Sequence, residues 1–255
     1  MNNKLNLLIY FLRKDIKAKY AGSALGILWT FLMPAVQILL LWFVFSAIMK
    51  ARPYANTNMP YIYFLLSSYF FWLAFSEGLM RASNSIIENT DIVKKISFPN
   101  IILPVAVTLS SYLPHLVGFM LFIAAYSFAT SFSPVILLVI FIILLQLLFS
   151  VGMGMLFSAL LPYVRDLGQI LSQVLAGLFF LSPIIYSIEA VPGKIKILFQ
   201  FNPLTYFIIS YHKIILLREM PDFFDISIIV LLAAGALACG FYAFNRLKEG
   251  FPDVL

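Results

Sequence analysis

The pattern of apolar and polar positions divides the chain into long uncharged runs separated by short polar segments. The longest run, from Ile96 to Val164, contains no Asp, Glu, Lys or Arg, and a polar group at 130–134 splits it in two. A helix crosses the hydrocarbon core of a bilayer with about 20 apolar residues, so this run predicts two spans joined by a tight turn. Four other uncharged runs, each long enough for one crossing, predict one further span each. The sequence therefore predicts an all-α polytopic membrane protein with six transmembrane helices, at 21–49, 54–76, 99–129, 135–161, 167–188 and 226–245.

The first 20 residues predict a helix that lies at the membrane surface. At 100° per residue an apolar stripe separates from a basic face, which is the pattern of an interfacial helix. The stripe consists of Leu5, Leu8, Ile9, Leu12, Ile16 and Tyr20. The residues expected to meet headgroups or a cytoplasmic partner are Arg13, Lys14, Lys17, Lys19 and Tyr20. A membrane anchor with no partner explains the pattern equally well.

The segment at 189–225 is expected to dip into the membrane from outside without crossing it. Its uncharged part, Ile197 to Tyr211, is too short to span and is broken by Asn202-Pro203. Irregular backbone at membrane depth must be satisfied by protein or by a water-filled cavity. We therefore expect two outer re-entrant half-helices, Lys194 to Phe201 and Leu204 to Leu217, with an outer gate at Asn202, Pro203 and Leu204. Two helices lying flat on the outer surface are the alternative.

The segment at 77–100 mixes charges of both signs with isoleucines. A short cytoplasmic helix stopped by Pro99 fits it, and exposed apolar residues with a charged rim favour a contact with another protein. The residues predicted to make this contact are Glu88, Asp91, Ile92, Val93, Lys94, Lys95 and Ile96.

Composition supports a single transmembrane domain over residues 1–255. Hydrophobic residues make up 62% of the chain and charged residues 11%, whereas a soluble domain carries about 25% charge. Six helices and their connections leave no room for a soluble catalytic domain. The only cysteine, Cys239, lies in the last predicted span, which excludes a disulfide or a thiolate metal site within one chain.

The basic residues predict the orientation. The run of basic residues from Arg13 to Lys19 stands where a signal peptide would be cleaved, so we expect no cleavage. With both termini in the cytoplasm, eleven Lys and Arg residues lie inside and six outside, as the positive-inside rule requires. The net charge of +6 is then explained by membrane orientation, without nucleic acid as a partner.

No energy source is apparent in the sequence. The predicted spans contain no charged residue, and their main polar side chains are Gln37, His115, Gln146 and Gln173. Ion-coupled transporters place ionisable groups at such depths. A phosphate-binding loop is also missing, because the only Gly-Lys pair, at Gly193, is followed by Ile195. The chain is therefore expected to bind no cofactor of its own and to depend on a partner for energy.

Aromatic residues are the side chains that could contact a transported molecule. One helical stripe in the second span carries Tyr61, Phe64, Ser68, Phe71 and Phe75. Rings and hydroxyls arranged in this way could let a long glycan slide past, so the stripe is a candidate channel lining. Lipid-facing rings and interface belts are the competing explanation.

Six groups of residues, in this order, carry a family resemblance. They are Arg13 to Tyr20; Gly22-Ser23 and Leu25-Gly26 with Trp29 and Pro34; Lys94 to Pro99 with Leu103-Pro104; Arg165-Asp166; Ser182 to Tyr186; and Asn202 to Leu204 with Arg218. Together they resemble the membrane subunit of ABC-type polysaccharide exporters, which move O-antigen, capsule and teichoic-acid chains. The resemblance covers almost the whole chain.

This resemblance implies a channel-forming permease that is not itself an enzyme. It implies a homodimer carried on two copies of a separately encoded ATP-binding subunit, which would bind ATP and Mg. A lipid-linked polysaccharide would leave the cytoplasm across the inner membrane, with the segment at 88–96 docked into the ATPase and the outer half-helices above the channel. A permease of the same architecture for a lipid or a drug is the first alternative. A multispan lipid-modifying enzyme, which would need acids or histidines clustered at one membrane face, is the second.

Overall fold

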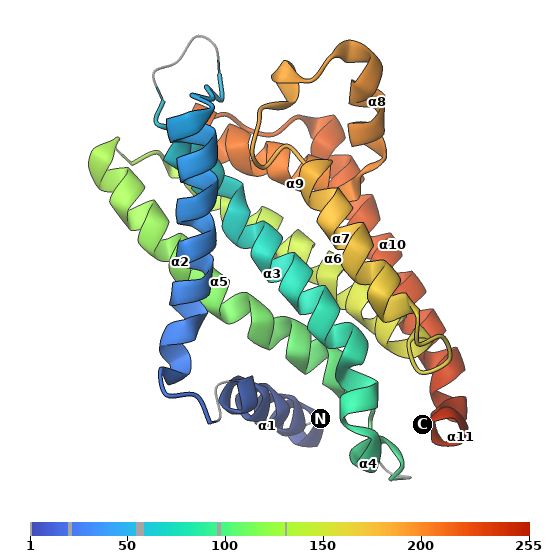
Figure 1. Ribbon diagram of the computed structural model, residues 1–255. Helices are drawn as coiled ribbons and strands as arrows, with labels where there is room; N and C mark the ends of the chain where they lie inside the picture. Colours follow the sequence, from blue (N-terminus) through green and yellow to red (C-terminus); the bar gives the residue numbers. More distant parts are fainter. Residues whose placement is uncertain (1, 20–21, 55–58, 96–97, 131) are drawn as a thin grey trace.

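Five apolar runs of the sequence form helices long enough to cross a membrane (Figure 1). The computed structural model describes residues 2–19, 22–54, 59–95, 98–130 and 132–255. The long helices are α2 (Trp29–Trp42, continued by the π-helix η2, Phe43–Ile48), α3 (Tyr61–Glu88), α5 (Ile102–Ala129), α6 (Leu138–Leu160, preceded by η3, Pro134–Leu137) and α10 (Phe223–Leu247). These correspond to five of the six predicted spans.

The fifth predicted span is shorter than expected. Helix α7 covers Leu167–Phe180, and the chain then turns through 181–186, where Pro183 provides no amide hydrogen for a continuing helix. Its 14 residues rise about 21 Å, less than the hydrocarbon core of about 30 Å. Its predicted C-terminal third, 181–188, is therefore irregular.

Helix α3 is longer than expected. The sequence predicts the end of this span at Ser76, but the helix continues to Glu88. Apolar residues at helical spacing continue past the charged positions, and Leu79, Ala82 and Ile86 are buried against the bundle. The expected separate helix over 77–100 is thus reduced to α4 (Thr90–Val93), and Glu77 and Arg81 belong to the spanning helix.

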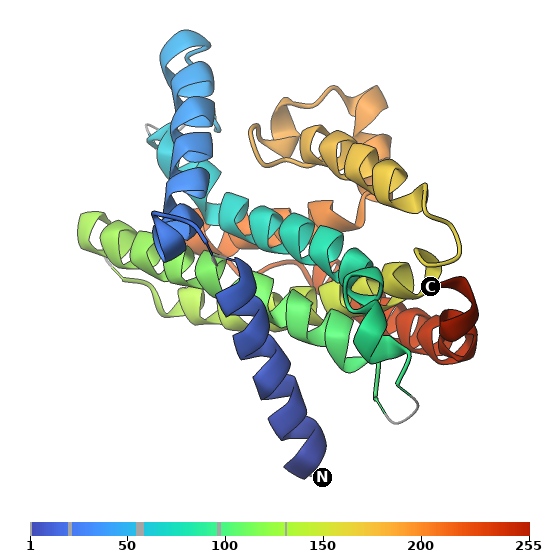
Figure 2. The same cartoon turned by 60° about the horizontal axis from the view of Figure 1, so that its bottom comes forward.

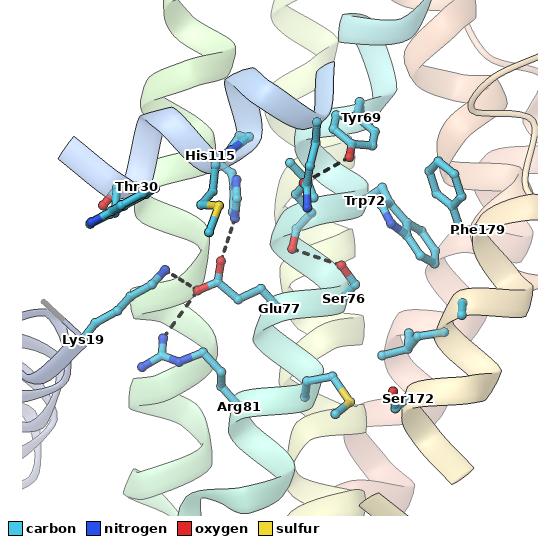
Figure 3. A pocket seen from close by; sticks show the side chains of 18 of the residues that line it. Lys19, Thr30, Tyr69, Trp72, Ser76, Glu77, Arg81, His115, Ser172 and Phe179 are labelled. Atoms are coloured by element: carbon cyan, nitrogen blue, oxygen red, sulfur yellow. Dashed lines mark hydrogen bonds and ion pairs between the residues drawn. The ribbon is translucent and has the colours of Figure 1, made fainter. Parts of the chain in front are cut away.

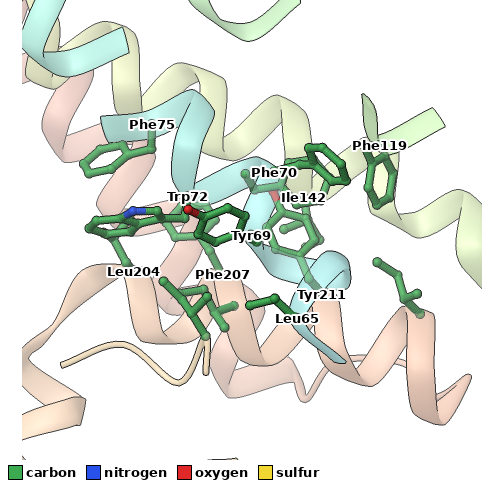
Figure 4. Packing of buried hydrophobic residues seen from close by; sticks show 14 of the residues in the cluster. Leu65, Tyr69, Phe70, Trp72, Phe75, Phe119, Ile142, Leu204, Phe207 and Tyr211 are labelled. Carbon is green, nitrogen blue, oxygen red and sulfur yellow. The ribbon is translucent and has the colours of Figure 1, made fainter. Parts of the chain in front are cut away.

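Helices α3, α5, α6 and α10 form the centre of the bundle, where aromatic rings fill the core (Figure 4). Phe71 stacks on Tyr211 with ring centroids 4.0 Å apart. Gln146 crosses this core, because its Nε2 donates to the carbonyl of Phe71 at 2.9 Å and its Oε1 accepts from the Tyr211 hydroxyl at 2.6 Å. Both polar atoms of the buried amide thus have a hydrogen-bond partner, as burial requires.

The two ends of the bundle differ. At one end, which we call the terminal end, lie both chain termini, α1 (Asn2–Lys19), α4 and α11 (Phe251–Val254) (Figure 1). At the opposite, distal end lie the connection between α2 and α3 and helix α8 (Gly193–Phe201). A second buried cluster ties the terminal end together, with members that include Phe11, Val93, Phe244 and Phe251. The two ends of the described chain thus lie at the same end of the bundle, as two cytoplasmic termini would require, and the side of the membrane stays a prediction.

Candidate transport groove

A groove with a volume of about 810 Å³ is lined by residues of α2, α3 and α7. Figure 2 shows the arrangement of these helices, with α3 running between α2 and α7. The walls of the groove include Trp29, Met33, Gln37, Tyr69, Trp72, Ser76, Glu77, Arg81, His115, Ser172, Ala176, Phe179 and Phe180, and Lys19 of α1 lies at its charged part. Helices α2 and α7 are the least covered of the apolar helices, so this groove faces outward from the chain.

One part of the groove is aromatic (Figure 3). The rings of Trp72 and Phe179 lie 5.6 Å apart and those of Tyr69 and Phe179 lie 6.1 Å apart, which joins α3 to α7. The Tyr69 hydroxyl donates to Gln37 Oε1 at 3.2 Å, which joins α3 to α2. The groove therefore presents flat apolar rings beside groups that form hydrogen bonds.

The other part of the groove is charged and centres on Glu77 (Figure 3). Its Oε2 lies 3.0 Å from His115 Nε2, and its Oε1 accepts from Lys19 Nζ and lies 3.7 Å from Arg81 Nη1. Each of these groups comes from a different place in the fold: Lys19 from α1, Arg81 one turn along α3, and His115 from α5. Glu77 thus joins three helices at one edge of the groove.

The same cluster fixes α1 to the bundle. Arg81 Nη2 donates to both carboxylate oxygens of Asp15 at 2.7 Å, and Arg81 Nη1 donates to Ser111 Oγ at 3.0 Å. Asp15 also accepts from the hydroxyl of Ser110. Hydrogen bonds between ionised groups are roughly twice as strong as those between neutral groups. We call Asp15, Lys19, Glu77, Arg81 and His115 the ion-pair network.

The predicted aromatic stripe lies elsewhere. Tyr61, Phe64, Ser68, Phe71 and Phe75 are all buried inside the chain. Tyr61 donates to the carbonyl of Ile185 at 2.8 Å, and the ring of Phe75 stacks on Phe149. These residues form the core, so their expected role as an open channel lining does not fit this fold. The groove uses the neighbouring face of α3, about one residue further round the helix, where Tyr69, Trp72 and Ser76 lie.

The predicted contact segment is exposed only in part. Glu88, Asp91, Lys94 and Lys95 are exposed, Ile92 is half-buried and Val93 is buried in the cluster of the terminal end. The expectation that Val93 forms part of an exposed apolar anchor is therefore wrong. Ile96 lies outside the described residues.

A helix, α1, forms over the residues predicted to lie at the membrane surface, but its buried face differs from the predicted stripe. Leu5 and Ile9 are exposed, whereas Phe11 is buried and its ring lies 5.3 Å from that of Phe98. The predicted basic residues Arg13, Lys14, Lys17 and Lys19 are exposed on α1, and Tyr20 lies outside the described residues. The sequence reading missed Phe11 and Asp15, since one was absent from the expected stripe and the other was counted only as a charge.

Two helices occupy the expected half-helix positions at the distal end. They are α8 and α9 (Pro203–His212), and α9 continues as the π-helix η5 (Lys213–Leu217). Asn202 caps α9, because its Oδ1 accepts from the amide of Leu204 at 3.0 Å. Its Nδ2 donates to Ser182 Oγ at 2.8 Å. Asn202 and Leu204 are buried, so the predicted outer gate is here a packed helix joint.

Comparison with known proteins assigns the architecture to a family. The model of the ABC-2 type transporter family matches residues 6–216. Two Klebsiella pneumoniae proteins named O-antigen export system permease protein RfbA are each 28% identical over 98% of this chain and 95% of their own length. A Myxococcus xanthus protein of the same name is 26% identical over 97% of this chain and 94% of its own. The grooved helical bundle thus belongs to the ABC-2 type transporter family of multi-pass membrane permeases.

Proposed function

We propose that this chain is the permease subunit of an ATP-driven exporter that moves an O-antigen-like, lipid-linked polysaccharide out of the cytoplasm. The observation that carries the proposal is the groove, which places the rings of Tyr69, Trp72 and Phe179 beside uncharged polar groups. Aromatic faces and hydroxyl partners suit a sugar chain that must slide without one deep binding site. The names of the relatives that match over nearly their whole length support the same cargo.

In this proposal the polysaccharide passes through a conduit between subunits, and the groove is the wall that one subunit contributes to it. It is open on one side, and the outer face of α2 carries large exposed apolar residues, among them Phe31, Met33, Leu39 and Leu40. A second copy of the chain would cover such a face and close the conduit. We therefore propose a homodimer, in which α7 and the irregular residues 181–188 together complete the sixth crossing.

Energy comes from a partner subunit that binds ATP and Mg. The chain contains no phosphate-binding loop. The docking surface for this partner is the exposed part of the predicted contact segment, namely Glu88, Asp91, Lys94 and Lys95, beside the basic face of α1. Both surfaces lie at the terminal end (Figure 1). A partner that binds ATP works in the cytoplasm, so the proposal assigns this end and both termini to the cytoplasmic side of the inner membrane.

The distal helices α8 and α9 cover the outer mouth. Their role as a gate rests on the break at Asn202 and on the exposed apolar side chains of α8, of which Phe201 is the most exposed. Because α9 is packed in the core, opening would move α8 about the Asn202 joint.

The test is to delete the gene and identify the cargo that accumulates. The expected result is glycan on its lipid carrier in the cytoplasmic leaflet, with wild-type amounts restored by the intact gene. A Phe179→Ala variant, which opens the aromatic wall, should restore export only in part at normal protein level. Accumulation of a lipid or a drug with normal surface glycan would overturn the proposed cargo.

A further inference from the structure

Helix α7 carries two exposed glutamines whose side chains take no part in the packing of the bundle. Gln169 and Gln173 stand four residues apart, which places them on one face. The opposite face packs into the bundle through Leu171 and Leu175. We call Gln169 and Gln173 the glutamine stripe. The space beside this face is open, since no other helix of the described chain borders it.

The glutamine stripe differs from Gln37 of α2 and Gln146 of α6, whose side chains are bonded within the chain. Gln37 accepts from Tyr69, and Gln146 bonds to both Tyr211 and Phe71. Among the residues that the structure describes, the side chains of Gln169 and Gln173 have no hydrogen-bond partner. A partner for them must come from outside this chain.

Lipid is a poor partner for such groups. A carboxamide in hydrocarbon loses the hydrogen bonds that it makes in water, at a cost of several kcal/mol. The stripe must therefore face water, another protein or a polar ligand. It lies beside the groove, since Ser172 and Ala176 of the same helix line the groove wall.

We propose that Gln169 and Gln173 are the hydrogen-bonding contacts of the conduit for glycan hydroxyls. This inference rests on the proposed function. A carboxamide both donates and accepts, as does a sugar hydroxyl, and it carries no charge that would hold a passing chain in place. The aromatic rings would then support the flat sugar faces while the glutamine stripe exchanges hydrogen bonds with successive residues of the chain.

The first experiment measures which medium the stripe faces. In a Cys239→Ser background, cysteine is placed at Gln173 or at Leu231, an exposed apolar position of α10. A charged, membrane-impermeant methanethiosulfonate reagent reacts with the ionised thiol, which forms in water and not in lipid. We expect Gln173→Cys to react and Leu231→Cys to stay largely unmodified. An unreactive Gln173→Cys would overturn the inference. Oxidation to a Gln173→Cys disulfide between two copies would do so too, because the stripe would then be a protein interface.

The second experiment measures export with the partner ATPase present. Gln169→Met with Gln173→Met removes the hydrogen-bonding groups at nearly constant volume, and Ile170→Met is the matched control on the same helix. Loss of one or two hydrogen bonds per passing sugar should slow the appearance of surface glycan on the order of five- to thirty-fold. The amount of membrane-inserted protein and its ATP hydrolysis without cargo should not change.

The two proposals fail in different ways. Wild-type export by the double Met variant would overturn the glutamine contacts and leave the exporter intact. Gene deletion without glycan accumulation would overturn the exporter itself.

Discussion

At the scale of single residues, Gly152 and Gly240 decide how closely α6 and α10 approach. A Cβ atom on Gly240 would stand 2.1 Å from the carbonyl oxygen of Gly152, and one on Gly152 would stand 2.3 Å from the backbone of Ala236. The backbones are in direct contact, as is common where small residues line membrane helices. Gly240→Val should therefore destabilise the fold by about 1–3 kcal/mol, seen as a lower melting temperature of the purified protein in detergent.

Gly235 on the same helix is the matched control. A Cβ atom there meets no other atom within 4 Å. Gly235→Val should melt at least as high as the wild type, because valine has a slightly better helix propensity than glycine. Equal melting of the two variants would show that α6 and α10 can separate without cost.

At the scale of elements, α1 is held to the bundle by three main contacts, one of which is the ion pair between Lys19 and Glu77. Phe11 packs against Phe98, and the carboxylate of Asp15 takes both bonds from Arg81. Removal of the contact with Asp15 in Arg81→Gln should release the C-terminal half of α1, because it leaves Asp15 half-buried without its cation. Trypsin should then cut after Lys14 or Lys17 on the order of ten-fold faster in membranes. The exchanged pair Asp15→Arg with Arg81→Asp should recover protection in part. Unchanged cleavage in the single variant would mean that the contacts of Phe11 and Lys19 hold the helix without Arg81.

Most of these elements were predictable from the sequence, and the failures have physical causes. Hydropathy located the long helices because lipid leaves few alternatives to a helix. It misplaced the end of α3 because Glu77 and Arg81 looked like a solvent-exposed segment, whereas Asp15, Lys19 and His115 satisfy them within the fold.

The position of the groove on α3 depends on tertiary contacts, which the sequence pattern does not contain. Periodicity showed that α3 has an aromatic face, but it does not distinguish Phe71 from Trp72, which both belong to the buried core, while only Trp72 also lines the groove. The packing of α9 onto α3 decides between them, since Tyr211 covers Phe71. Tertiary packing of this kind is absent from a single sequence.

At the scale of the whole molecule, the terminal end combines a rigid cluster with a charged surface. Val93 packs in one cluster with Phe11, Phe244 and Phe251, which come from three other helices. A displacement of α4 from its exposed side would therefore be transmitted to both α1 and the end of α10. Val93 is buried and its neighbours Lys94 and Lys95 are exposed, so the structural role of this segment and its proposed contact role fall on different residues.

Two variants test these two roles separately, because each should change a different measured quantity. Val93→Asp places a charge in the buried cluster, so the amount of folded protein in the membrane should fall sharply. Lys94→Glu with Lys95→Glu changes only exposed charges, so the protein should insert normally while its capture of the ATP-binding subunit weakens and export stops. Co-purification with the tagged ATPase subunit, measured against total membrane protein, distinguishes the two. If the double lysine variant still bound its ATPase and exported normally, the contact would have to lie elsewhere on the terminal end, and the exposed basic face of α1 would be the remaining surface to test.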